Sequence, residues 1–161
     1  MVNIKVSRIL KIDPQKIWAL INRVERFPEW LPGVVSAQMA DQKNKQSGFG
    51  REQLLKTRTE FGVVESLQKV IVWDPPNKIT WEHLRDVVNG QKFTYAREIK
   101  TTFSITNMDG EITLRIVGSW IPSGISGRLM NRVMEKAVTK QFSKALENLE
   151  NILEEADETN S

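Results

Sequence analysis

Apolar residues recur at three- and four-residue spacing near the C-terminal end of the chain, where neither proline nor glycine interrupts the sequence from Arg128 to Ala156. This period predicts one long amphipathic helix with a continuous apolar stripe along one face. Upstream, apolar and polar residues alternate, which is typical of β-strands with one buried face. The predicted helix stripe consists of Leu129, Met130, Val133, Met134, Val138, Phe142, Ala145, Leu149, Ile152 and Ala156.

Seven segments before the helix have the alternation of strands, and short turns join most of them. Turn signals include Asn89-Gly90, and the polar stretch Asp41–Ser47 predicts a hairpin loop. Consecutive strands joined by short turns are antiparallel. Asp13-Pro14 predicts the N-cap and first turn of a helix, and Pro28 and Pro32 bracket a second, shorter helical segment. The predicted strands are 4–12, 34–39, 49–57, 63–73, 79–87, 93–106 and 112–121.

The predicted sheet is wider than the helix that must cover it. Seven strands have six interstrand spacings, about 29 Å in a flat sheet, whereas a helix with its side chains is about 10–12 Å across. The sheet must therefore curve around the helix, and the concave surface that the helix leaves uncovered is either filled by large side chains or left as an apolar pocket.

Composition narrows the class of protein. The chain has 161 residues, 40% of them hydrophobic and 27% charged, which predicts one domain over residues 1–156 followed by a frayed acidic tail, 157–161. No apolar run has the length of a membrane span or a signal-peptide core, so we expect a cytoplasmic protein. Zero cysteines and the single His83 exclude thiolate and two-histidine metal sites, and no cofactor is expected. A net charge of +3 gives no reason to expect nucleic-acid binding.

Several segments match a known family. They read IDPQKIWALI at 12–21, FPEWLPGV at 27–34 and VWDPPNKI at 72–79, and IPSG at 121–124 leads into the long helix. The chain thereby resembles the polyketide cyclase/dehydrase and lipid-transport family of the START-like (Bet v 1-like, SRPBCC) superfamily. This resemblance implies an α+β helix-grip fold, in which a curved seven-stranded antiparallel sheet wraps around the C-terminal helix and two short helices lie between strands 1 and 2. It also implies a hydrophobic ligand cavity between sheet and helix.

Parity along the strands predicts which side chains line that cavity. The inward positions are the odd ones on 79–87 and 93–106 and the even ones on 112–121, provided that no bulge changes the register. Among these positions, His83, Tyr95 and Arg97 are the candidates to orient a ligand oxygen or move a proton. The predicted ligand-binding set is Trp81, His83, Phe93, Tyr95, Arg97, Phe103, Leu114, Trp120, Met130 and Met134.

Each candidate also has a purely structural interpretation. A lone histidine is commonly satisfied by protein partners, a strand-end arginine commonly extends to solvent, and Tyr95 is equally explained as a packed aromatic residue with a satisfied hydroxyl. Methionines suit a plastic wall for varied apolar ligands, yet Met130 and Met134 at helical spacing are also ordinary core residues.

Two functions remain open. The first is a non-catalytic carrier or chaperone for a lipid, an isoprenoid quinone or a polyketide. The second is an aromatic polyketide cyclase or dehydratase that acts by acid–base chemistry in the same cavity. The sequence favours the carrier, because His83 has no sequence-evident base beside it and no carboxylate is predicted to face inward.

A basic stripe follows one flank of the long helix at strict four-residue spacing. Such a stripe is usually a solvated helix face. The alternative interpretation is a strip that contacts an anionic membrane surface transiently. The stripe consists of Arg128, Arg132, Lys136, Lys140 and Lys144.

The sequence leaves the oligomeric state of the protein open.

Overall fold

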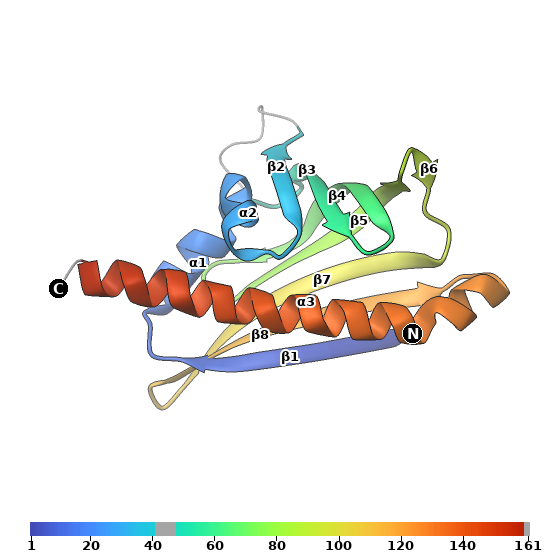
Figure 1. Ribbon diagram of the computed structural model, residues 1–161. Helices are drawn as coiled ribbons and strands as arrows, with labels where there is room; N and C mark the ends of the chain where they lie inside the picture. Colours follow the sequence, from blue (N-terminus) through green and yellow to red (C-terminus); the bar gives the residue numbers. More distant parts are fainter. Residues whose placement is uncertain (41–47, 160–161) are drawn as a thin grey trace.

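The computed structural model describes residues 1–40 and 48–159. One curved antiparallel sheet wraps around a long C-terminal helix, α3 (Gly124–Thr159), as the predicted helix-grip fold requires (Figure 1). Two short helices, α1 (Pro14–Ile21) and α2 (Phe27–Trp30), follow the first strand, with a 3-10 turn, η1 (Val24–Arg26), between them. The strands are β1 (Val2–Leu10), β2 (Val34–Met39), β3 (Glu52–Thr59), β4 (Gly62–Asp74), β5 (Lys78–Val88), β6 (Gln91–Lys92), β7 (Ala96–Met108) and β8 (Glu111–Pro122).

The sheet order is β1-β8-β7-β5-β4-β3-β2, so the first strand lies beside the last one. In the described part of the chain, all strand pairs are antiparallel, in agreement with the short turns of the sequence. The seven predicted strands are present. The structure adds β6, which has two residues and pairs with the end of β5. The loop predicted at Asp41–Ser47 lies outside the described residues.

Helix α1 begins where the sequence predicts. The side chain of Asp13 accepts a hydrogen bond of 2.8 Å from the backbone N–H of Gln15, and Pro14 occupies the first turn. The apolar face of the helix then enters the core with four buried residues. These are Ile17, Trp18, Leu20 and Ile21.

Aromatic rings fill one end of the trough between sheet and helix. Trp81 lies between Phe27 and Phe103, with ring centroids 5.6 Å and 5.1 Å away. Trp30 of α2 contacts the rings of Phe27 and Phe103 edge-on, at 5.2 Å and 5.4 Å. The C-terminal half of α3 packs into the same core through Phe142, Ala145, Leu146, Leu149 and Leu153.

Polar contacts fasten α3 along this packed half. Gln141 donates a hydrogen bond to the carbonyl of Pro32, and Asn148 donates one to the carbonyl of Trp30. At the far end, Lys16 pairs with Asp157 at 2.6 Å. This ion pair connects α1 to the last turn of α3.

The N-terminal half of α3 is less covered. It starts at Gly124, earlier than the predicted Arg128, and its inward side chains Met130, Met134 and Val138 are only partly buried. One hydrogen bond of 2.9 Å from the indole of Trp120 to Asn131 connects this half to β8. The trough is thus packed at one end and open at the other, which is where the candidate site lies.

Candidate functional site

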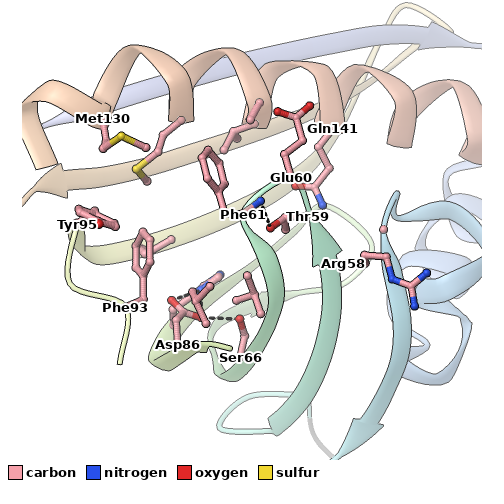
Figure 2. A pocket seen from close by; sticks show the side chains of 18 of the residues that line it. Arg58, Thr59, Glu60, Phe61, Ser66, Asp86, Phe93, Tyr95, Met130 and Gln141 are labelled. Atoms are coloured by element: carbon pink, nitrogen blue, oxygen red, sulfur yellow. Dashed lines mark hydrogen bonds and ion pairs between the residues drawn. The ribbon is translucent and has the colours of Figure 1, made fainter. Parts of the chain in front are cut away.

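A cavity of about 910 Å³ separates the N-terminal half of α3 from the sheet. Met130, Met134 and Val138 line it from the helix. Strand residues line the opposite wall, and Figure 2 shows Met130 across the cavity from Ser66 and Asp86. The volume lies within the usual range for small-molecule sites, roughly 300–1,000 Å³.

A smaller hollow of about 200 Å³ continues the cavity toward the packed end. The two spaces share Ser66, His83, Trp120 and Val138 among their lining residues, and the smaller one ends against Trp81 and Phe103. The aromatic cluster that packs the core is therefore also the floor of the site.

The structure brings most of the predicted ligand-binding residues to these two spaces and leaves two outside them. Leu114 is on the inner face as parity predicts, but it is fully buried in the packed core. Arg97 is exposed and lines neither space. Of the predicted set, the residues that line the larger cavity are His83, Phe93, Tyr95, Trp120, Met130 and Met134. Those that line the smaller one are Trp81, His83, Phe103 and Trp120.

A β-bulge explains the position of Arg97. Along β7 and β8, Arg97 pairs with Ile121 but Lys100 pairs with Ser119, so β7 holds one extra residue. Glu98 lies in this irregular stretch with φ of 52°. One extra residue reverses the alternation of inward and outward side chains. The inward parity predicted for this strand therefore applies from Ile99, which lines both spaces, onward and not at Arg97.

A second bulge brings Asp86 to the cavity. On the β4–β5 pair, Gln68 faces His83 and Leu67 faces Arg85, so Leu84 is the extra residue of β5. After it, Arg85 is exposed and Asp86 lines the cavity. The expectation that no carboxylate faces inward was wrong, because strand alternation was carried through the bulge.

One sequence signal indicated this polar wall. Gln53 on β3 and Ser66 and Gln68 on β4 interrupt otherwise apolar inward positions, and all three are buried. A row of polar residues on a buried strand face requires partners. The partners on β5 that strand alternation alone did not identify are His83 for Gln68 and Asp86 for Ser66.

Asp86 is the centre of a partly buried hydrogen-bonded cluster. The Nδ1 atom of His83 lies 3.0 Å from Oδ1 and 2.9 Å from Oδ2 of Asp86, and the hydroxyl of Ser66 donates to Oδ1. The other ring nitrogen of His83, Nε2, lies 3.1 Å from Nε2 of Gln68. Both ring nitrogens of the histidine are therefore engaged within the protein.

The environment of Asp86 favours its charged form. Burial raises the pKa of the carboxyl group, but the hydrogen bond from His83, the positive charge of its imidazolium form and the hydrogen bond from Ser66 together lower that pKa by more. The net pKa lies below the ordinary value of 3.8. The wall thus presents a carboxylate at neutral pH.

The cluster continues away from the cavity through three more side chains. Gln53 donates to Gln68 at 2.9 Å, and Arg51 donates to Gln53 at 3.4 Å. Arg51 also donates to the backbone oxygen and the side-chain oxygen of Asn22, at 3.0 Å and 3.1 Å. Burial lowers the pKa of Arg51, an effect that the charge of Glu25 opposes. A continuous series of hydrogen-bonded polar side chains therefore crosses from β3 over β4 to β5 and ends at the cavity.

The mouth of the cavity has a different character. Phe93 and Tyr95 contact each other edge-on with ring centroids at 5.5 Å, and Tyr95 is 41% exposed at the rim. Figure 2 shows Phe61 extending from the β3–β4 turn toward α3. Four exposed cationic residues also line the mouth, and these are Arg58, Lys92, Lys140 and Lys144.

This arrangement can hold an elongated apolar molecule and hydrogen-bond one polar group of it. In the described part of the chain, no group of three or more histidine, cysteine, aspartate or glutamate side chains is placed to hold a metal ion. Among the helices of that same part, none combines the length and apolar character needed to cross a bilayer.

The family described as "Polyketide cyclase / dehydrase and lipid transport" matches residues 1–154 of the chain. No curated protein matches the sequence.

Solved structures with the same fold share little sequence with this chain. A START superfamily protein from Mycobacterium smegmatis has a TM-score of 0.73 at 13% identity, covering 96% of this chain and 98% of that one. The Zhui aromatase/cyclase from Streptomyces sp. R1128 has a TM-score of 0.76 at 10% identity, with coverages of 95% and 93%. A conserved protein from Geobacillus kaustophilus has a TM-score of 0.74 at 11% identity, with coverages of 96% and 97%. At these identities the likeness concerns the fold.

Proposed function

Because the chain belongs to the polyketide cyclase/dehydrase and lipid transport family, we propose that it binds a hydrophobic small molecule between α3 and the sheet, as a carrier or chaperone. The ligand classes are a lipid, an isoprenoid quinone or a polyketide. The observation that carries the proposal is the cavity of about 910 Å³, open at the mouth and closed by the aromatic cluster.

The walls support an apolar ligand. The apolar residues with which α3 lines the cavity are Met130, Met134, Ala137 and Val138. Transfer of an apolar ligand from water to such a wall is favourable by roughly 25 cal/mol for each Å² buried. Methionine side chains adapt to different shapes, which suits a site that accepts more than one chain length.

The direct test is native mass spectrometry of protein purified without detergent, followed by thermal unfolding with a panel of lipids, quinones and aromatic polyketides. A bound molecule, or stabilisation by one ligand class, is expected. The variant Ala137→Trp fills the cavity and should abolish binding, whereas Thr139→Trp on the exposed side of α3 should leave it unchanged. Absence of any bound molecule, together with no stabilisation across the panel, would contradict the proposal.

A second candidate function is favoured by the carboxylate and imidazole at the cavity wall. In a cyclase or dehydratase, Asp86 is the group that accepts a proton from a poly-β-ketone chain. His83 stabilises the negative charge of the Asp86 carboxylate before the transfer. We rank this below the carrier because both nitrogens of His83 are occupied by protein partners. Turnover of a poly-β-ketone thioester that is lost in Asp86→Asn, with ligand binding retained, would reverse the ranking. Turnover unaffected by changing His83 or Tyr95 would remove those residues from consideration.

The carrier function includes delivery, for which the exposed flank of α3 is suited. Arg128, Arg132 and Lys136 are exposed near the cavity half of the helix. Ile125 and Leu129, in the same part of α3, are 79% and 76% exposed. Apolar side chains beside a basic stripe suit contact with an anionic lipid surface. We therefore include transient membrane contact in the proposal.

A further inference from the structure

We propose that the polar wall of the cavity selects ligands whose polar end is a hydroxyl group that donates a hydrogen bond. Arg51 sets this preference through the series of hydrogen-bonded side chains that ends at Asp86. The inference rests on the proposed function, because it names the chemistry of the ligand that the cavity would hold.

The chain begins at a residue that only donates hydrogen bonds. Arg51 is 7% exposed, and its guanidinium has N–H groups and no acceptor. One of its nitrogens, Nη1, donates to both oxygens of Asn22, and Nη2 lies 3.4 Å from Oε1 of Gln53. The amide of Gln53 must therefore turn its oxygen toward Arg51.

This orientation determines every later hydrogen bond. With its oxygen toward Arg51, Gln53 directs Nε2 to Oε1 of Gln68 at 2.9 Å. Gln68 then directs its own Nε2 to Nε2 of His83 at 3.1 Å. Reversing either amide would place two donors face to face in a buried site, which costs the hydrogen bond and leaves a buried polar group unsatisfied.

The histidine is consequently held in one tautomer. Its Nε2 accepts a hydrogen bond from Gln68, so the hydrogen of the neutral ring is on Nδ1, which donates to Asp86 at 2.9 Å from Oδ2. The hydroxyl of Ser66 also donates its hydrogen to Asp86. No hydrogen of His83 or Ser66 remains to be donated into the cavity.

Where the cluster borders the larger cavity, its three residues His83, Asp86 and Ser66 therefore offer a ligand only lone pairs and negative charge. Asp86, whose side chain is 9% exposed, and Ser66 both line the cavity. A phenolic, enolic or alcoholic hydroxyl can donate to them, whereas an ether, a carbonyl or a carboxylate meets a second acceptor. Hydrogen bonds to charged groups contribute more than neutral ones, so the preference should be measurable.

The mouth argues against an amine as the donor. A ligand reaches the cluster past Arg58, Lys92 and Lys140, which outnumber the one acidic lining residue at the mouth, Glu60, while Lys144 is paired with Glu147 at 3.3 Å. An ammonium group is repelled by the net positive charge of the mouth, while a neutral hydroxyl is not. The favoured ligand is thus an apolar molecule with a hydroxyl at its inner end.

The first test compares two probes that differ only in the donor, 1-naphthol and 1-methoxynaphthalene, by isothermal titration calorimetry with the full chain. We expect 1-naphthol to bind about tenfold more tightly or better. Equal affinity of the two probes would overturn the inference and leave the proposed function intact. If neither probe binds and the lipid and quinone panel also fails, the proposed function fails, and the inference falls with it.

The second test reads the tautomer directly. The chain has one histidine, so its ring nitrogens can be assigned without ambiguity in the ¹⁵N NMR spectrum of the full protein. The wild-type protein should carry the hydrogen on Nδ1 of His83, and a hydrogen on Nε2 of the neutral ring would overturn the inference without any variant.

Substitutions then isolate Arg51 as a positioning residue. Arg51→Met removes the donors. It should allow the other tautomer of His83 and reduce the preference for 1-naphthol to within about twofold. Arg51→Lys should retain the Nδ1 hydrogen and the preference for 1-naphthol. Arg115→Met, an exposed arginine on β8, is the matched control and should change neither. If Arg51→Met does not fold, Gln68→Met interrupts the same chain next to His83. A folded variant of either kind that keeps the Nδ1 hydrogen and the full preference would exclude a role for the chain.

Discussion

The Nδ1 atom of His83 lies 2.9 Å from Oδ2 of Asp86, although the two residues are three positions apart on one strand. On a regular strand such residues point to opposite faces of the sheet. The bulge at Leu84 turns Asp86 to the face of His83 and so creates the polar wall of the cavity. A local irregularity of the backbone thus determines which chemistry the cavity contains.

Asp86 should make the protein sensitive to acid. The pKa of its carboxyl group is lower in the folded protein than the ordinary 3.8, so its contribution to the free energy of unfolding is complete above that value. The contribution is lost as the pH falls from about 4 through the lower folded pKa. At pH 7, Asp86→Asn should reduce the free energy of unfolding by about 1–3 kcal/mol.

Urea unfolding of the wild-type protein and Asp86→Asn over a pH series measures this effect. The difference between the two proteins should narrow as the pH drops below about 4, because only the wild type loses the charged carboxylate. Asp109→Asn, an exposed aspartate in the β7–β8 turn, should follow the wild type. A difference that stays constant over the acid range would show that the charge of Asp86 does not stabilise the fold.

Gly118 on β8 lies close to the helix. A Cβ atom at this position would be 2.8 Å from Cε2 and 3.2 Å from Cζ of Phe142. Because Phe142 is buried, Gly118→Ala should lower the free energy of unfolding by about 1–3 kcal/mol. Combining it with Phe142→Leu should cost less than the sum of the two single changes, by about 1 kcal/mol. Additive effects in a double-mutant cycle would contradict this contact.

The cap of α1 should be measurable on its own. Asp13→Ala removes the acceptor of the 2.8 Å hydrogen bond from the N–H of Gln15 and should cost about 1 kcal/mol in urea unfolding. Asp13→Asn keeps a side-chain oxygen and is the matched control, with an expected loss of only a few tenths of a kcal/mol. An equal loss in both variants would mean that the negative charge, and not the hydrogen bond, stabilises the helix.

Membrane contact predicts that the flank of α3 binds anionic vesicles. Each basic residue near such a surface contributes about 1 kcal/mol. The triple change of Arg128, Arg132 and Lys136 to glutamine should therefore weaken binding to phosphatidylserine vesicles about a hundredfold, as measured by cosedimentation at low salt.

The control removes the same number of charges elsewhere. Lys5, Lys11 and Lys78 are exposed on or beside other strands, and their change to glutamine should have a much smaller effect. Equal weakening in both triple variants would indicate attraction by net charge alone, and no binding by the wild type would remove membrane contact from the proposal.

Much of the architecture could be predicted from the sequence because it depends on local patterns. The period of apolar residues predicts α3, the alternation and turn residues predict the seven main strands, and Asp13-Pro14 predicts the start of α1. The comparison of sheet width with helix width also anticipated unfilled space, since it needs only the number of elements. Local patterns also placed most of the predicted residues around that space.

The pairing of the strands decided which polar side chains face the cavity. The bulges at Leu84 and Glu98 reverse the side-chain alternation, and both are visible only when the register of one strand is read against its neighbour. The alternation of a single strand contains no information on where an extra residue enters. For that reason Arg97 was expected in the cavity and Asp86 was not.

The sequence by itself determined the elements, their antiparallel order and the apolar character of the site. Only the tertiary structure decided which polar groups meet there, because the chain from Arg51 to Asp86 joins side chains of three strands. Hydrogen bonds of this kind depend on distances of about 3 Å between residues far apart in sequence. Such distances are set by the packing of the whole sheet and not by any segment of it.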